Sequence, residues 1–186
     1  SLPDIHRLFE IKGKVALITG ATGGFGRAAC FGLAAAGVNI MATGRTENKL
    51  KLLVQEIKNA GGTAAFSVGA PDDHDDVKKV VQDTVKTFSG IDILITAAGV
   101  NVPAPMVDQP VEDWQEVMDV NVKGTWLYCK EAGRVMIDQW RGGKVILVSS
   151  TRGMLGMANY YFSVFDDIFD FYDIPNEMKY MSIIES

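Results

Sequence analysis

The sequence has few residues of the kinds that form disulfides or bind metals. Its 186 residues include two cysteines, Cys30 and Cys129, and two histidines, His6 and His74. Both cysteines fall within expected helices, so they are predicted to be unpaired apolar fillers. Such thiols are typical of a reducing, cytoplasmic setting. The two histidines are too few and too far apart to predict a metal site.

Long apolar runs are also missing. No stretch approaches the roughly 20 apolar residues of a membrane span, and residues 1–7 lack the charged and apolar regions of a signal peptide. The composition, 47% hydrophobic and 22% charged, is that of an ordinary globular protein. These features predict one domain that does not bind a membrane.

Basic residues are not in excess, since the formal net charge is −5. This balance argues against nucleic acid as a partner. Residues 160–186 hold six acids against one lysine, and eight of the 17 aromatic residues. We therefore expect a domain over residues 1–160 and an aromatic, acidic helical tail over 161–186, packed on the same domain. That tail is predicted to cover a flank of the last strand, unless a second copy of the chain covers it.

Apolar runs of strand length alternate with segments of helical periodicity. This alternation predicts an α/β fold with a doubly wound parallel sheet, shortened after its fifth strand. In the last helical segment, Trp114 and Trp126 are among the expected core residues. The predicted strands are 15–18, 38–43, 63–68, 91–96 and 144–149, and the predicted helices are 27–36, 46–60, 72–90 and 111–139.

A glycine turn joins the first strand to the first helix. Gly20, Gly24 and Gly26 permit a sharp turn and a close backbone approach, and the helix behind them begins with free amide groups that suit a phosphate. By itself such a turn is as often structural as functional. In a doubly wound sheet, however, ligands bind outside the carboxyl ends of the strands, where this turn is expected.

Four short motifs, in order, give the sequence a family resemblance. They are Thr19-Gly20-x-x-x-Gly24-x-Gly26, Ala97-Ala98-Gly99, Asn121-Val122-x-Gly124 and Ser149-Ser150-x-x-Gly153. With these motifs the chain resembles the short-chain dehydrogenase/reductase family over about residues 10–160. The resemblance implies a Rossmann-like domain that transfers a hydride between a nicotinamide cofactor and a small carbonyl or alcohol substrate.

The resemblance also implies a set of cofactor-binding residues. Arg45 follows the second strand, where a carboxylate would favour NAD and a guanidinium suits the 2′-phosphate of NADP. NADP is therefore the expected cofactor and NAD the second choice, unless Arg45 is only a solvated loop charge. The expected cofactor-binding residues are Gly20, Thr22, Gly24, Phe25, Gly26, Arg45, Thr46, Ala98 and Gly99.

The expected catalytic residues match the family only in part. Ser150 and Asn121 match its serine and asparagine, although each can also be read as a structural hydrogen-bonding residue. The family tyrosine would fall at Ser163, whereas Tyr160 and Tyr161 lie nearby, and neither has a lysine four residues later. No lysine lies between residues 144 and 179.

Three functions therefore stay open. The first is an oxidoreductase that uses Ser150, Asn121 and either Tyr160 or Tyr161. The second is a nucleotide-binding or interaction protein without turnover, and the third is a truncated product such as a splice form. A homo-oligomer is possible, because the helices near residues 111–139 commonly pair subunits in the family. The substrate itself is not indicated.

Overall fold

A computed structural model describes residues 10–150, which form a parallel five-stranded sheet covered by helices. The strands lie in the order β3-β2-β1-β4-β5. The predicted α/β class and doubly wound sheet are confirmed. The strands are β1 (Val15–Thr19), β2 (Asn39–Gly44), β3 (Thr63–Val68), β4 (Ile93–Thr96) and β5 (Lys144–Leu147), and the helices are α2 (Gly24–Ala35), α3 (Glu47–Asn59), α4 (His74–Phe88), α5 (Val111–Met118) and α6 (Gly124–Asp138), with a 3-10 turn at Met106–Asp108.

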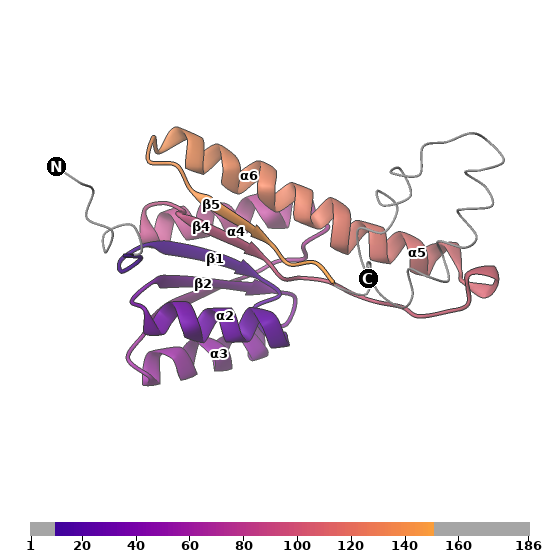
Figure 1. The fold of residues 1–186 in the computed structure, drawn as a ribbon, viewed down its shortest axis with the longest axis horizontal. Coiled ribbons are helices and arrows are strands. Elements are labelled where there is room, and N and C mark those ends of the chain that lie inside the picture. The colour runs from indigo at the N-terminus through magenta and orange to yellow at the C-terminus, as the bar shows by residue number, and fades with distance from the viewer. Residues whose placement is uncertain (1–9, 151–186) are drawn as a thin grey trace, which may run out of the picture.

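Alternate residues of β1, β2, β3 and β4 serve two separate cores, as the period of a strand requires. On one face Ala16 and Ile18 of β1 pack with α2 and α3. On the other face Leu17 packs with α4 and α6. Figure 1 shows these two helical layers on opposite sides of the sheet. Cys30 belongs to the first core and Cys129 packs against the second, so both are free thiols, as predicted.

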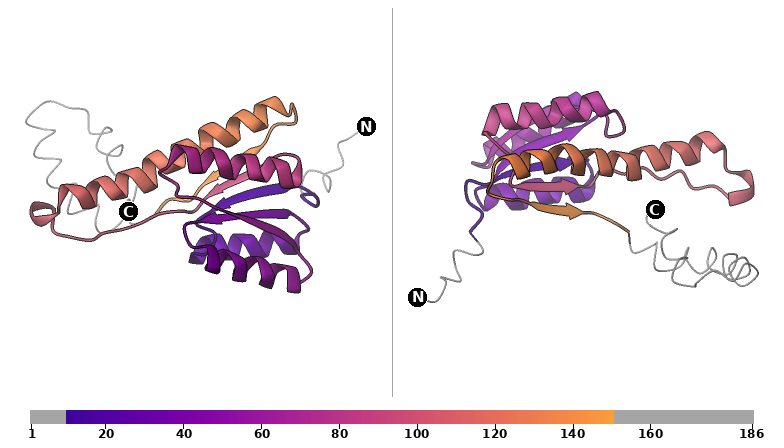
Figure 2. Two further views of the ribbon diagram at one scale, coloured as in Figure 1. Left: turned by 180° about the vertical axis from the view of Figure 1, so that it is seen from behind. Right: turned by 90° about the horizontal axis from the view of Figure 1, so that it is seen from above.

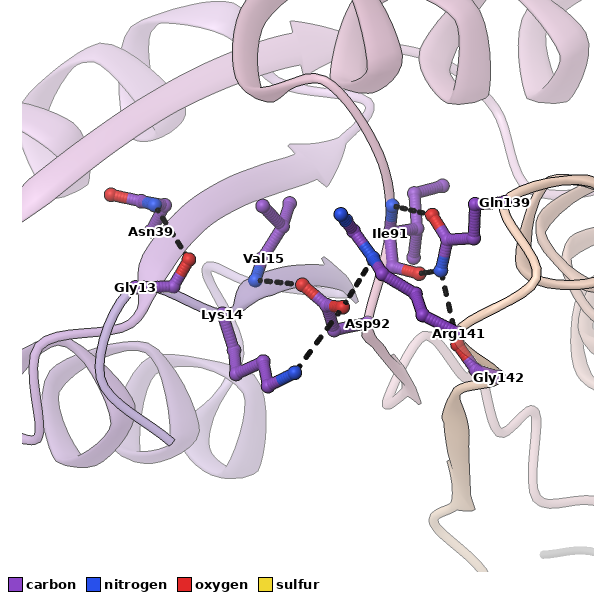
Figure 3. A network of polar contacts seen from close by, with 9 residues as sticks. All are labelled: Gly13, Lys14, Val15, Asn39, Ile91, Asp92, Gln139, Arg141 and Gly142. Atoms are coloured by element: carbon purple, nitrogen blue, oxygen red, sulfur yellow. Dashed lines mark hydrogen bonds and ion pairs between the residues drawn. The ribbon is translucent and has the colours of Figure 1, made fainter. Parts of the chain in front are cut away.

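A polar network holds the amino ends of the central strands together (Figure 3). The buried carboxylate of Asp92 accepts a hydrogen bond from the Val15 amide at 2.9 Å. The Nε atom of Arg141 lies 3.0 Å from the same carboxylate, and the Nζ atom of Lys14 lies 3.8 Å from it. The loop after α6 is thereby fixed to β1 and β4.

Strand β4 begins two residues later than predicted, and both backbone groups of Ile91 bond to a side chain. The Gln139 amide nitrogen donates to the Ile91 carbonyl at 2.6 Å, and its oxygen accepts from the Ile91 amide at 3.3 Å. Figure 3 shows this pair of bonds beside the Asp92 network. The sequence pattern shows that Ile91 is apolar, but it does not indicate which groups its backbone hydrogen-bonds to.

The predicted helix over residues 111–139 is interrupted by a π-helical segment, Asp119–Lys123, between α5 and α6. Figure 2 shows α5 extending beyond the layered part of the molecule. Trp114 is 52% exposed and Trp126 57% exposed. The expectation that both are core residues is wrong, because the sheet lies beneath one side of α6 only and α5 has no buried residue.

Within residues 10–150, β5 pairs with β4 alone, and its four residues are exposed. The predicted tail over 161–186 lies outside the described residues, so its position stays a prediction. In the described part of the chain, no helix has both the length and the apolar character needed to cross a membrane.

Candidate functional site

Two adjoining hollows open at the carboxyl ends of the strands. One, of about 240 Å³, reaches from Phe25 to Ser150. The other, of about 270 Å³, reaches from the glycine turn to Arg45. The loop after β4, residues 97–100, lines both of them. The two hollows therefore adjoin and have a shared wall, at the place where a doubly wound sheet binds its ligands.

Close backbone approaches shape this surface. Gly20 has a φ of +58°, and a Cβ atom there would overlap the carbonyl oxygen of Ala97. A Cβ atom at Gly26 would overlap the carbonyl oxygen of Gly20. Glycine at these two positions therefore lets the end of β1, the start of α2 and the shared wall come into contact.

A buried threonine holds the shared wall through hydrogen bonds. It is not among the predicted site residues. The backbone amides of Ala97 and Ala98 both donate to Oγ1 of Thr19 at 3.1 Å. Thr19 ends β1 and is 2% exposed. Its place in the glycine motif indicated that it lies near the site. Its hydrogen-bond partners could not be read from the motif, because they lie 78 and 79 residues away in the sequence.

The predicted cofactor-binding residues fall into four groups. Gly20, Thr22, Arg45 and Thr46 line the larger hollow, Phe25 lines the smaller one, and Ala98 and Gly99 line both. Gly24 and Gly26 line neither hollow, and instead form the first turn of α2. The larger hollow has further lining residues outside the predicted cofactor-binding set: Gly23, Gly44, Lys49, Pro71, Ala97, Val100 and Val120.

The first turn of α2 presents open amide groups toward this surface. Its N-cap is Gly23, which lines the larger hollow and has no side chain to cap the helix. The free amides and the positive end of the helix dipole favour an anion there. The role of the glycine turn as a phosphate cradle stays a prediction.

Asn121 clamps the shared wall. Its Oδ1 atom accepts from the Val100 amide at 2.8 Å, and its Nδ2 atom donates to the Val100 carbonyl at 2.9 Å. Asn121 lies within the π-helical segment, a feature that often occurs at functional sites. Asn121 thus makes structural hydrogen bonds, and its partner lies in the loop after β4.

The predicted catalytic residues are only partly within the described chain. Ser150 lines the smaller hollow together with Asn121 and Phe25. Tyr160 and Tyr161 lie outside the described residues. The one tyrosine within residues 10–150, Tyr128, is buried in the core, and this burial raises its pKa to about 12. Tyr128 is therefore unsuited to exchange a proton near neutral pH.

Comparison with known proteins identifies relatives of this arrangement. The family model described as short chain dehydrogenase matches residues 14–162. An uncharacterized oxidoreductase of Mycobacterium tuberculosis is 41% identical over 82% of this chain and 56% of its own length. A glucose 1-dehydrogenase of Gluconobacter oxydans is 34% identical over 80% of this chain and 56% of its own.

A solved structure has the same fold over most of the described chain. It is a short-chain type dehydrogenase/reductase from Mycobacterium marinum, with a TM-score of 0.78 and 33% identity, and the match covers 82% of this chain and 62% of that one. The chain thus spans a little more than half the length of the two curated relatives described above.

Proposed function

The chain belongs to the short chain dehydrogenase family, and we propose that it binds a nicotinamide dinucleotide across its two hollows. There it would exchange a hydride between that cofactor and a small carbonyl or alcohol substrate. One observation carries the proposal. The glycine turn and Ser150 line two adjoining hollows, with residues 97–100 as the common wall.

The residues present suit the parts of a dinucleotide. Arg45 and Thr46 would hold the adenosine end, and the open amides at the start of α2 would hold the pyrophosphate. Phe25, 78% exposed, offers an apolar surface for the nicotinamide end next to Ser150. When bound, the cofactor supplies or accepts the hydride.

NADP is the preferred form in this proposal, and NAD the second choice. Arg45 lines the larger hollow, and a guanidinium can bind a phosphate through two hydrogen bonds at once. The carboxylate nearest to Arg45 in the sequence is that of Glu47, and its Oε1 atom lies 2.7 Å from the Nζ atom of Lys51. A carboxylate in that pair is poorly placed to accept the ribose hydroxyls of NAD.

The chain's own groups would act on the substrate oxygen. The Ser150 hydroxyl would hydrogen-bond to it, and Asn121 would act through Val100 by keeping the shared wall in place. Proton transfer is assigned to Tyr160 or Tyr161. Hydride transfer needs that proton because the substrate oxygen changes its charge as the hydride moves.

Titration with NADPH and NADH, followed by nicotinamide fluorescence, tests the binding half of the proposal. Turnover across a panel of ketones and alcohols tests the chemical half. Ser150→Ala is expected to bind cofactor as the unchanged chain does and to lose most turnover, about a hundredfold. If the chain binds neither dinucleotide, the proposed function is wrong.

A second candidate is cofactor binding without turnover. Two observations favour it: no lysine lies between residues 144 and 179, and Tyr128 is held in the core. The same assays separate the candidates, because this one predicts saturable cofactor binding and no product from any substrate in the panel.

For partners, we propose a second copy of this chain beside the small-molecule substrate. A mostly apolar groove of about 400 Å³ runs along α5 and α6, and it is lined by Trp114, Gln115, Met118, Asp119, Val122, Lys123 and Trp126. Exposed apolar surface of this kind marks association sites. The cytoplasmic location and the packing of residues 161–186 on the same domain stay predictions.

A further inference from the structure

Two lysines near the start of α3 have different surroundings. Lys51 lies 2.7 Å from Glu47, one helical turn earlier. Lys49 has no acidic residue three or four positions away on either side, since those positions hold Arg45, Thr46, Leu52 and Leu53. The usual explanation for a helical surface lysine, a pair with a carboxylate one turn away, therefore does not apply to Lys49.

Lys49 faces the larger hollow together with Arg45. Both side chains are exposed, and within residues 10–150 neither forms an ion pair or a hydrogen bond. Of the described residues that line this hollow, none is acidic. Two uncompensated positive charges thus lie at one end of a surface that has no negative charge of its own.

The start of α3 adds a third favourable group. Its N-cap is Thr46, whose side chain makes no capping hydrogen bond. The first-turn amides of this 13-residue helix therefore remain open beside Arg45 and Lys49, with the positive end of the helix dipole behind them. All three groups belong to one end of the hollow, away from Ser150.

We propose that Lys49 is a second phosphate-binding residue, which acts with Arg45 on the 2′-phosphate of the adenine ribose. This inference rests on the proposed function. A phosphate monoester has a charge near −2 at neutral pH, so one guanidinium compensates only part of it. A lysine ammonium adds a compact point charge that can complete the compensation. The two hydroxyls of an unphosphorylated ribose gain much less from a second cation.

Charge-removing variants test the role of Lys49. Dissociation constants for NADPH and NADH are measured for the unchanged chain, Lys49→Gln and Arg45→Gln. Lys58→Gln is the matched control, because it removes the same charge from the last turn of the same helix, away from the hollow. Adenosine 2′,5′-bisphosphate and adenosine 5′-monophosphate serve as competitors that lack the nicotinamide. Circular dichroism checks that each variant is folded.

Lys49→Gln is expected to weaken NADPH and the bisphosphate about tenfold, with NADH and the monophosphate changed less than about twofold. Lys58→Gln is expected to change none of these constants. Equal losses for both dinucleotides, or no loss for NADPH, would overturn the role of Lys49 and leave the proposed function standing. A chain that binds no dinucleotide at all would overturn both.

Discussion

The side-chain amide of Asn121 bonds both backbone groups of Val100. Its Oδ1 atom lies 2.8 Å from the Val100 nitrogen, and its Nδ2 atom lies 2.9 Å from the Val100 oxygen. Asn121 is 7% exposed, so water does not readily replace these bonds. The pair connects a π-helical segment to the loop that both hollows share. This asparagine is therefore a positioning residue for the whole surface.

Replacing Asn121 by leucine removes both bonds and leaves the Val100 amide and carbonyl without partners. We expect the free energy of unfolding to fall by about 2–3 kcal/mol, the usual effect of two lost bonds at a buried site. Cofactor affinity should fall as well, because the shared wall loses its clamp. Denaturant unfolding and NADPH titration measure the two effects.

Gln82→Leu, on the exposed side of α4, is the control for the Asn121 substitution. It should change neither the free energy of unfolding nor the cofactor affinity by more than the experimental error. Unchanged stability in Asn121→Leu would contradict the assigned clamp.

Glycines 20 and 24 should respond differently to alanine. At Gly20 the φ of +58° and the nearby Ala97 carbonyl both oppose a Cβ atom, so Gly20→Ala is expected to lose about 2–4 kcal/mol of stability. At Gly24 a Cβ atom meets nothing within 4 Å, so Gly24→Ala should keep or slightly raise stability. Thermal unfolding compares the two variants.

Cofactor titration then tests the predicted contact at Gly24. If the backbone at this position approaches a bound phosphate, Gly24→Ala should weaken the cofactor while remaining fully folded. Gly133→Ala in α6, which also has open space around the new methyl group, is the matched control. Equal affinities for the two variants would remove Gly24 from the cofactor site.

Glu131 should make stability fall at acid pH. Its Oε1 atom lies 2.8 Å from the Nε2 atom of His74, and this bond, aided by the charges of Arg134 and Lys130, lowers the pKa of Glu131 below its usual 4.5. A carboxyl group whose pKa is lowered in the folded chain stabilises the fold at pH values above its unfolded pKa. This contribution is lost as the pH falls through the folded pKa.

Unfolding of the unchanged chain and of Glu131→Gln, followed from pH 7 down to about pH 3, measures this contribution. The difference in the free energy of unfolding between the two proteins should be constant above the usual pKa of a glutamate and should shrink below it. Asp138→Asn, an exposed acid further along α6, is the control. A difference that does not change with pH would contradict the ionic contribution of Glu131.

The apolar groove of α5–α6 predicts self-association. Trp114→Ser combined with Trp126→Ser should shift the chain toward the monomer, because both side chains lose most of the apolar area that they expose. Sedimentation velocity over a range of concentrations measures the shift. Trp140→Ser, which removes an exposed tryptophan outside the groove, is the control. A monomeric unchanged chain would contradict the proposed pairing.

Local patterns in the sequence were sufficient for the fold class. Strand-length apolar runs such as Val15–Ile18 and the helical spacing of Leu50, Leu53 and Ile57 depend on neighbours a few residues away. The structure confirms the parallel sheet and its helices. The same patterns did not show that Trp114 and Trp126 are exposed, because the burial of a helix face depends on which elements pack against it.

By itself, the sequence determined the succession of strands and helices along the chain, the glycine turn between Gly20 and Gly26, and the motifs that resemble the family. Each of these depends on residues close together in the chain. Only the tertiary structure decided that Asn121 holds Val100, that Thr19 holds the shared wall, and that Lys49 faces the same hollow as Arg45. The first two contacts join segments that are distant in sequence. The third depends on how α3 packs, so periodicity alone does not specify it.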